Sequence, residues 1–282
     1  MVLRNEILND YSVYCDQKLK SEFGQYSDVN NDPIYLYQRY KCRIIEERQR
    51  RVNTPSNLVI PDAHKRAYDN IVSDIENGNP LRKYQSRNLK NLNYDDDMLS
   101  HWGVQHLHLG EFIESDGFIN RTGKLLFVYF TNESANIIGF FGHGVWCDLD
   151  LIEIMHANWP QELSVYKKYS DASKLTTDEY QALRSINGNA NITVQDGTEY
   201  LCPGMGVTGN GAPVNAILNS DKVILNFNQE YELIVENIDK VLAADPEGRS
   251  SDTVTIGVEL DQNSKEFVYI VKETSFRFTL AT

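Results

Sequence analysis

The sequence predicts an α+β fold, in which a helical N-terminal segment packs on a central antiparallel sheet and a second, acidic α+β part follows. Two patterns indicate this fold. Apolar residues recur at every fourth position of residues 61–77, as on one face of a helix, and residues 104–143 contain alternating or continuous apolar runs, as in strands. The chain has 282 residues, which is enough to bury a large core without disulfides.

The N-terminal segment, residues 1–60, is predicted to be mainly helical. Its clearest helical stretch is PIYLYQRYKCRIIEERQRR, residues 33–51. The sequence VNTPSN follows and ends the helix, because Pro and Asn interrupt the helical hydrogen-bond pattern.

The central core, residues 61–160, is predicted to combine an amphipathic helix with three strands. Pro61 suits a first helical position and Gly78 suits the position after the last turn, so the helix is expected at 61–77. The strands are expected at 104–109, 124–131 and 135–143, and short helices near 98–101 and between Trp146 and Pro160. The second and third strands are apolar almost throughout, which is typical of strands covered on both faces.

The C-terminal part, residues 161–282, is also predicted to be α+β. Helices are expected near 178–186 and 229–242, and strands at 253–260, 266–273 and 275–281, the first two joined as a hairpin. The Gly-rich stretch at 204–211 lacks the Lys-Ser/Thr pair of a phosphate-binding loop, so it does not predict a nucleotide site.

The balance of charge changes along the chain. Residues 39–90 carry 12 Lys and Arg against 6 Asp and Glu, whereas residues 191–282 carry 6 against 14. The net charge of −13 speaks against a generic nucleic-acid-binding protein, because affinity for phosphate depends on clustered cations. The acidic C-terminal part is expected to cover a basic surface of the core or to dock a protein partner.

The sequence predicts a cytoplasmic protein. Its N-terminus lacks the apolar core of a signal peptide. No stretch approaches the roughly 18 apolar residues that span a membrane, so no membrane partner is expected. The four cysteines are widely spaced and form no CxxC pair, and we expect them to be reduced.

The most distinctive stretch is HLHL, residues 106–109. Five of the six histidines lie between residues 101 and 156. Alternate residues of a strand point to the same face, so His106 and His108 are expected side by side on an exposed face, with Leu107 and Leu109 in the core.

Three interpretations of these histidines are open. In the first, they are ordinary residues of a solvated or packed sheet face. In the second, His106, His108 and His143 bind zinc, and Glu111 is a fourth ligand or a base. In the third, histidines beside an arginine supply a base, an acid and a charge that stabilises a phosphorane, as RNA cleavage through the 2′-hydroxyl requires.

The order of residues in 61–156 resembles the core of the RelE/ParE toxins. IVSDIENGNPLRKYQSRNLK, HLHLG, RTGKLLFVYF and ANIIGFFGHGVW are similar to that family's helix with an Asn-Pro turn, strand with alternating basic residues, strand after an arginine, and apolar strand that ends in a basic residue before an aromatic. The resemblance implies a small α+β fold and a metal-free ribonuclease that acts on mRNA, often at the ribosome. Histidines replace most of that family's Lys and Arg, and the connection from His108 to Arg121 is longer.

The resemblance also implies roles for single residues. Carried over by position, these are base and transition-state stabilisers for His106 and His108, phosphate binding for Arg121 and Lys124, general acid for His143, and base stacking for Trp146. The acids of YDDD, residues 94–97, are expected to cap a helix rather than to bind a metal.

The function predicted is therefore that of a metal-independent ribonuclease without a cofactor, or of its inactive descendant, from a phage or mobile element. RNA or the ribosome is the expected partner. The alternatives are a non-enzymatic acidic protein-interaction module and a zinc hydrolase built on His106, His108 and His143.

Overall fold

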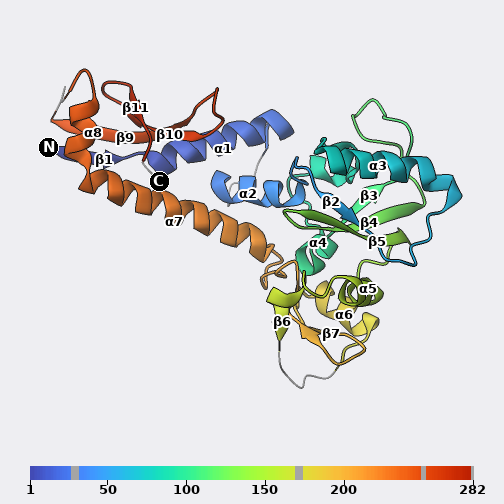
Figure 1. Ribbon diagram of the computed structural model, residues 1–282. Coiled ribbons are helices and arrows are strands. Elements are labelled where there is room, and N and C mark those ends of the chain that lie inside the picture. The colour runs from blue at the N-terminus through green and yellow to red at the C-terminus, as the bar shows by residue number, and fades with distance from the viewer. Residues whose placement is uncertain (27–31, 169–173, 249–251, 281–282) are drawn as a thin grey trace. The chain divides into compact units, whose positions relative to one another are not determined.

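The computed structural model describes residues 1–26, 32–168, 174–248 and 252–280. The chain has the predicted α+β fold and divides into two compact units (Figure 1). Unit 1 joins residues 1–39 to residues 216–282, and unit 2 comprises residues 40–215. These units differ from the three consecutive parts expected, 1–60, 61–160 and 161–282, because both ends of the chain contribute strands to one sheet.

Unit 1 is built on a four-stranded sheet of order β1-β9-β10-β11. Its strands are Val2–Asn5 (β1), Thr253–Leu260 (β9), Phe267–Val271 (β10) and Phe276–Phe278 (β11). Its helices are Ile7–Phe23 (α1), Pro33–Arg43 (α2), Val214–Glu236 (α7) and Ile238–Ala244 (α8), of which α2 and α7 extend a few residues into unit 2. β1 pairs with β9 in parallel, whereas β9, β10 and β11 are antiparallel neighbours.

The core of unit 1 forms where the N-terminal helix packs on the C-terminal sheet. Ile7, Tyr11 and Cys15 lie one turn apart on α1 and are buried in the same cluster as Val254 and Ile256 of β9. The N-terminal helical segment therefore packs on this sheet. The sequence had predicted instead that it packs on the central sheet. β1 and β9 are some 250 residues apart in the sequence. Pairing at this separation leaves no local sequence pattern from which the sheet could have been predicted.

Unit 2 contains the central sheet, of order β2-β5-β4-β3. Its strands are Arg51–Asn53 (β2), Val104–His108 (β3), Lys124–Phe130 (β4) and Ser134–Gly142 (β5). β3, β4 and β5 are antiparallel, and the edge strand β2 runs parallel to β5. A small second sheet of order β6-β8-β7 contains Lys167–Lys168 (β6), Ile192–Thr193 (β7) and Glu199–Tyr200 (β8).

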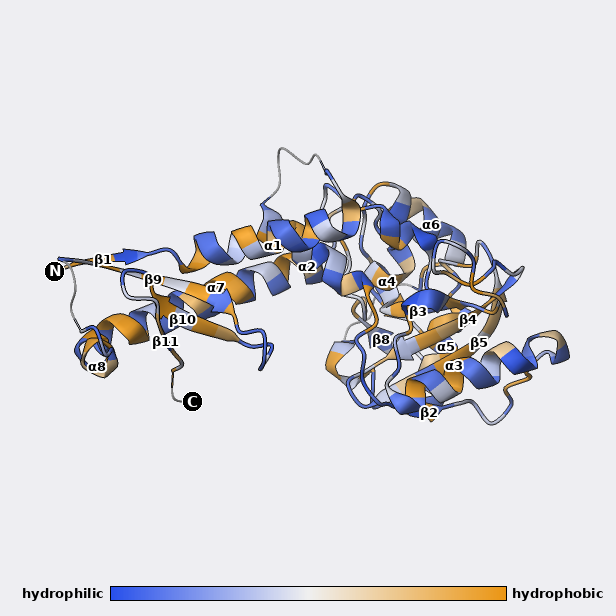
Figure 2. Cartoon of the chain, turned by 90° about the horizontal axis from the view of Figure 1, so that it is seen from above, coloured by the Kyte–Doolittle hydropathy of each residue, from blue (hydrophilic) through white to orange (hydrophobic). Residues whose placement is uncertain are grey.

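Both faces of the central sheet are covered. Helix α3 (Lys65–Asn77) buries Ile71 in one cluster with Leu107 of β3. On the other face, helix α5 (Asp150–Asn158) buries Ile152 in a cluster with Phe127 of β4. Figure 2 accordingly colours most of β4 and β5 as hydrophobic. Two further helices, Asp97–Trp102 (α4) and Thr177–Ser185 (α6), complete unit 2.

The helix expected at 61–77 is present as a short 3-10 turn followed by α3, and it ends at Gly78 in the left-handed conformation, with φ of 71°. Among the described residues, every helix is too short or too polar to cross a membrane.

Candidate functional site

A polar pocket of about 330 Å³ lies beside strand β3 in unit 2. Its lining brings together most of the residues that the sequence singled out, namely His106, His108, Arg121, His143 and Trp146. Ser86, Asn88 and residues 94–98 complete the lining. Segments far apart in the sequence therefore converge on one small volume.

Lys124, the sixth residue, is not part of this pocket. It lines a different pocket, together with Ile138 and Phe140. Residues paired across neighbouring strands share a face of the sheet, and His108 is paired with Leu125. Alternation along β4 then directs Lys124 away from the histidines, so the expected phosphate contact in this pocket is not formed.

The histidines of β3 are buried, which corrects the expectation of an exposed face. His106 and His108 are only 8% and 5% exposed. Trp146 covers His106, with its ring centroid 5.1 Å from that of the imidazole and its plane stacked at 10° on Phe127. Since one face of the indole is already stacked on Phe127, Trp146 serves first as a wall over the histidines.

The three imidazoles form a row. The ring centroids of His106 and His108 lie 6.3 Å apart, and those of His108 and His143 lie 6.2 Å apart. The Nδ1 atoms of His106 and His108 are buried without a hydrogen-bond partner. Their Nε2 atoms do not share that burial, so they are the nitrogens that solvent or a ligand in the pocket can reach.

Burial decides the charge of the two β3 histidines. Together with the neighbouring His106 and Arg121, it lowers the pKa of His108 to about 4. Burial also lowers the pKa of His106, although the carboxylate of Asp96 opposes the shift. Both imidazoles are therefore neutral at pH 7 and able to accept a proton.

Asp96 has two roles in this site. It caps helix α4, accepting a hydrogen bond of 3.0 Å from the backbone N–H of Leu99, which confirms the predicted cap. Its Oδ2 also lies 3.6 Å from Nδ1 of His106. The sequence did not indicate this second contact, because only the fold brings residues 96 and 106 together. The run of three acids marked Asp96 as notable but did not connect it with His106.

His143 lies at the open edge of the pocket and is held by the backbone. Its Nε2 is 3.2 Å from the carbonyl oxygen of Thr122. A carbonyl only accepts hydrogen bonds, so Nε2 must carry the hydrogen. Nδ1 is then the nitrogen that can exchange a proton with a ligand.

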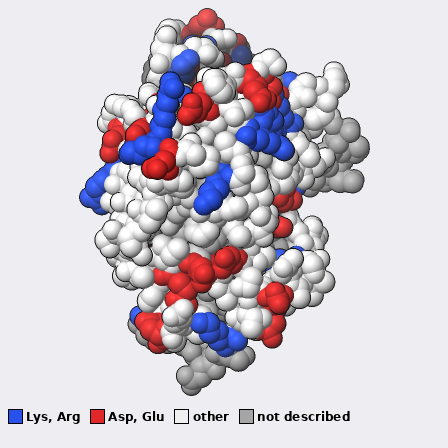
Figure 3. All heavy atoms as spheres, turned by 90° about the vertical axis from the view of Figure 1, so that its right-hand side faces the viewer, with Lys and Arg blue, Asp and Glu red and all other residues white. Residues whose placement is uncertain are grey.

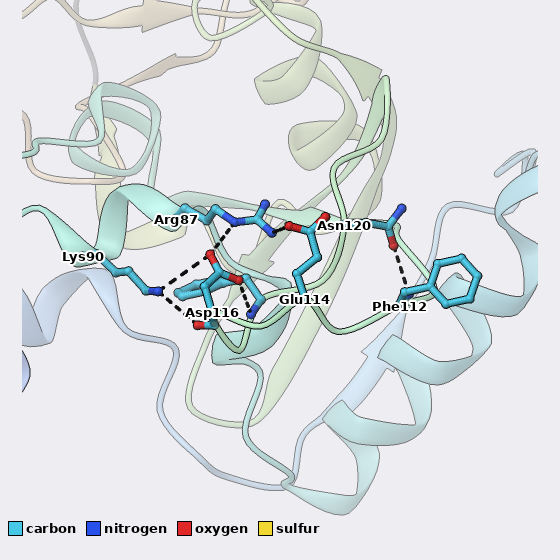
Figure 4. Close-up of polar contacts among 7 residues, drawn as sticks. Arg87, Lys90, Phe112, Glu114, Asp116 and Asn120 are labelled. Carbon is cyan, nitrogen blue, oxygen red and sulfur yellow. Dashed lines mark hydrogen bonds and ion pairs between the residues drawn. The ribbon is translucent and has the colours of Figure 1, made fainter.

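The loop that carries Arg121 and Thr122 is fixed by ion pairs (Figure 4). Arg87 contacts Glu114 and, at 2.7 Å, Oδ2 of Asp116, while Lys90 Nζ donates to the carbonyl of Asp116 at 3.0 Å. Across the loop, the Asn120 side chain accepts a 3.0 Å hydrogen bond from the N–H of Phe112. Cations of the basic segment 39–90 are thus used to hold this loop.

A buried arginine supports the wall of the pocket. Arg184 of α6 is 8% exposed, and its guanidinium lies 4.4 Å from the ring centroid of Trp102. It donates to the carbonyl of Trp146 and, at 3.3 Å, to Sγ of Cys147. These contacts fix the backbone at the residue that covers His106.

The ligand set of the zinc interpretation is not assembled. Among the described residues, no three His, Cys, Asp or Glu side chains are grouped to hold a metal ion. Glu111, the expected fourth ligand, instead lies 3.7 Å from Arg66 and does not line the pocket.

Comparison with known protein families, with curated proteins and with solved structures finds no match to this chain.

Proposed function

We propose that the histidine pocket is a metal-independent acid–base site that cleaves RNA by attack of a ribose 2′-hydroxyl on the adjacent phosphate. One observation carries the proposal: His106 directs Nδ1 toward the Asp96 carboxylate, while its Nε2 is the nitrogen open to the pocket. A carboxylate at this distance, although too far for a hydrogen bond, stabilises the imidazolium that forms when the ring accepts a proton, since its charge opposes the lowering of the His106 pKa by burial. His106 is accordingly the base.

The reaction assigns one role to each remaining group. Nε2 of His106 takes the proton of the 2′-hydroxyl, and the 2′-oxygen forms a bond to phosphorus. The bond from phosphorus to the 5′-oxygen breaks, and that oxygen takes a proton from Nδ1 of His143, which enters this reaction protonated on both nitrogens. The products are a 2′,3′-cyclic phosphate and a 5′-hydroxyl.

Arg121 stabilises the charge that develops on the phosphorane. It lines the pocket and forms no ion pair with a carboxylate of the described residues, so its guanidinium can bind phosphate. His108, between the other two imidazoles, is neutral at pH 7 because its pKa is about 4. It therefore adds no positive charge that would oppose protonation of His106.

The substrate is expected to be single-stranded RNA bound mainly through the pocket. On the face drawn in Figure 3, Lys and Arg alternate with Asp and Glu, and an acidic patch lies in its lower part. That face offers no continuous basic track for a duplex. A pocket of about 330 Å³ lies at the small end of ligand sites and suits one unstacked nucleotide at a time.

The first test is cleavage of a single-stranded RNA oligonucleotide in the presence of EDTA, with products identified by mass spectrometry. We expect a 2′,3′-cyclic phosphate, and no cleavage of the same oligonucleotide carrying a 2′-deoxy sugar at the scissile position. His106→Gln and His143→Gln should each lower the rate by roughly 10²-fold or more, as loss of a general base or acid does.

His64→Gln is the matched control, because His64 lies in the turn before α3 and does not line the pocket. Its rate should equal that of the wild type. Products with a 5′-phosphate, cleavage abolished by EDTA, or full activity in both pocket variants would each contradict the proposal.

A further inference from the structure

A second pocket, of about 570 Å³, lies wholly within unit 1. It is formed by α1, α7 and β10 and is unrelated to the histidines. Three of its walls are the aromatic rings of Tyr11, Phe227 and Phe267, whose centroids lie 5.0 to 6.2 Å apart. The planes of Tyr11 and Phe227 stand at 72° and 89° to that of Phe267. Aromatic rings of different orientation therefore border one cavity.

Two carboxylates belong to the same lining. Glu230 of α7 accepts a hydrogen bond from the hydroxyl of Tyr269, and Glu266 precedes β10 at the surface. Burial and the bond to Glu230 both raise the pKa of Tyr269, so its hydroxyl stays protonated as a donor. Neither glutamate forms an ion pair with a Lys or Arg of the described residues.

The surroundings add to this negative charge. Unit 1 carries 10 Lys and Arg against 18 Asp and Glu, a net charge of −8. No lysine or arginine in the described part of the chain lies over the rings of Tyr11, Phe227 or Phe267. The pocket thus combines aromatic walls with two carboxylates that form no ion pair with a Lys or Arg of the described residues.

We propose that this pocket binds an alkylammonium group, from a free organic amine or a lysine side chain. The electron-rich face of an aromatic ring attracts a cation, and the attraction grows as the cation loses water. The alkyl part of the ligand is expected to pack on apolar lining residues such as Val223 and Leu233, while the ammonium lies near Glu230 and Glu266.

Other classes of ligand fit this lining less well. An anion would face two carboxylates and the negative field of the unit. A neutral apolar ligand would fill the cavity but would remove water from the two glutamates without compensating their charge. Only a ligand that is both apolar and cationic satisfies both kinds of wall.

The test is an NMR titration of the full chain with n-butylammonium chloride and, as the neutral isostere, n-butanol. We expect n-butylammonium to bind at least several-fold more tightly. A blocked Gly-Lys-Gly peptide, titrated in parallel, distinguishes the two sources of the group. Tighter binding of the peptide indicates a protein partner, and tighter binding of the free amine indicates a small molecule. Equal binding of amine and alcohol, or no binding of either cation, overturns the proposal.

Variants locate the site. Glu266 is exposed, so Glu266→Gln should fold normally and weaken n-butylammonium binding by about 3- to 10-fold, with little effect on n-butanol. Glu232→Gln, on α7 but outside the lining, is the matched control and should leave both affinities unchanged. If Glu266→Gln binds the amine as tightly as the control does, the pocket is not the cation site.

Discussion

At the scale of single residues, the burial of histidines makes the free energy of unfolding depend on pH. The pKa of His108 is about 4, lowered mainly by burial, and the pKa of His101 is also about 4, lowered by burial and by Arg184. In the unfolded chain a histidine has a pKa of about 6.5. Between these values the unfolded state binds more protons than the folded state, so the free energy of unfolding falls as the pH drops from about 6.5 to about 4.

This sign gives a prediction for the free energy of unfolding measured in urea. Between pH 7 and pH 5, the change caused by each of the two histidines is expected to be a loss of roughly 2 kcal/mol. His108→Gln should therefore lose less stability than the wild type over this range. His64→Gln, which leaves the buried histidines untouched, is the control and should follow the wild type. An unchanged pH dependence in His108→Gln would show that His108 is not neutral in the fold.

Part of the candidate site could be predicted from single residues. The spacing of His106 and His108 on a strand already predicted that they share one face, and the resemblance to the toxin core implied that His143 belongs to the same site. Their burial could not be predicted, because Trp146 and the loop at 94–98 cover them only once the chain has folded. The same holds for Asp96, whose contact with His106 depends on where α4 begins.

At the scale of elements, the loop between β3 and β4 positions both Arg121 and the backbone carbonyl that holds His143. Its two arms approach closely: a Cβ added to Gly110 would lie 2.1 Å from the backbone oxygen of Asn120. Gly110→Ala must therefore push the arms apart and shift the residues that follow Asn120. We expect it to lower stability by about 1–3 kcal/mol, as overpacking does, and to slow the proposed RNA cleavage.

Gly123→Ala is the matched control in the same loop, because a Cβ at Gly123 would have no heavy atom within 4 Å. Thermal unfolding followed by circular dichroism should separate the two variants by several degrees. Equal melting temperatures would mean that the arms of the loop can separate without cost.

The helices and strands with a clear local sequence pattern are the ones that the sequence predicted well. α3, β3, β4 and β5 begin and end close to the expected residues, because amphipathic spacing, Gly78 and continuous apolar runs mark them clearly. The long helix α7 was expected near residues 229–242 but begins at Val214. Its first half contains several Asn residues, which have low helix propensity, and burial of Ala216, Ser220 and Phe227 compensates for it.

At the scale of the whole molecule, the boundary of unit 2 explains why a core cut at residue 61 would be incomplete. Tyr40 accepts a 2.6 Å hydrogen bond from Arg82, and the guanidinium of Arg43 donates to the carbonyls of Asn91 and Tyr94, each at 2.9 Å. Strand β2, also before residue 61, pairs with β5. These contacts hold the segment that leads into the acidic wall of the histidine pocket.

We therefore expect a fragment of residues 40–215 to fold by itself, since it contains both hydrophobic clusters of the central sheet and every lining residue of the histidine pocket. Its thermal unfolding should be cooperative. The fragment 61–160, which matches the core expected from the sequence, should unfold without a sharp transition. It lacks Arg43, β2 and the second sheet, including Tyr200 of the cluster beneath α5. Circular dichroism of the two purified fragments decides the matter. A cooperative transition in 61–160 would mean that Arg43, β2 and the second sheet are dispensable for folding of the core. No cooperative transition in 40–215 would mean that this part of the chain needs residues outside it to fold.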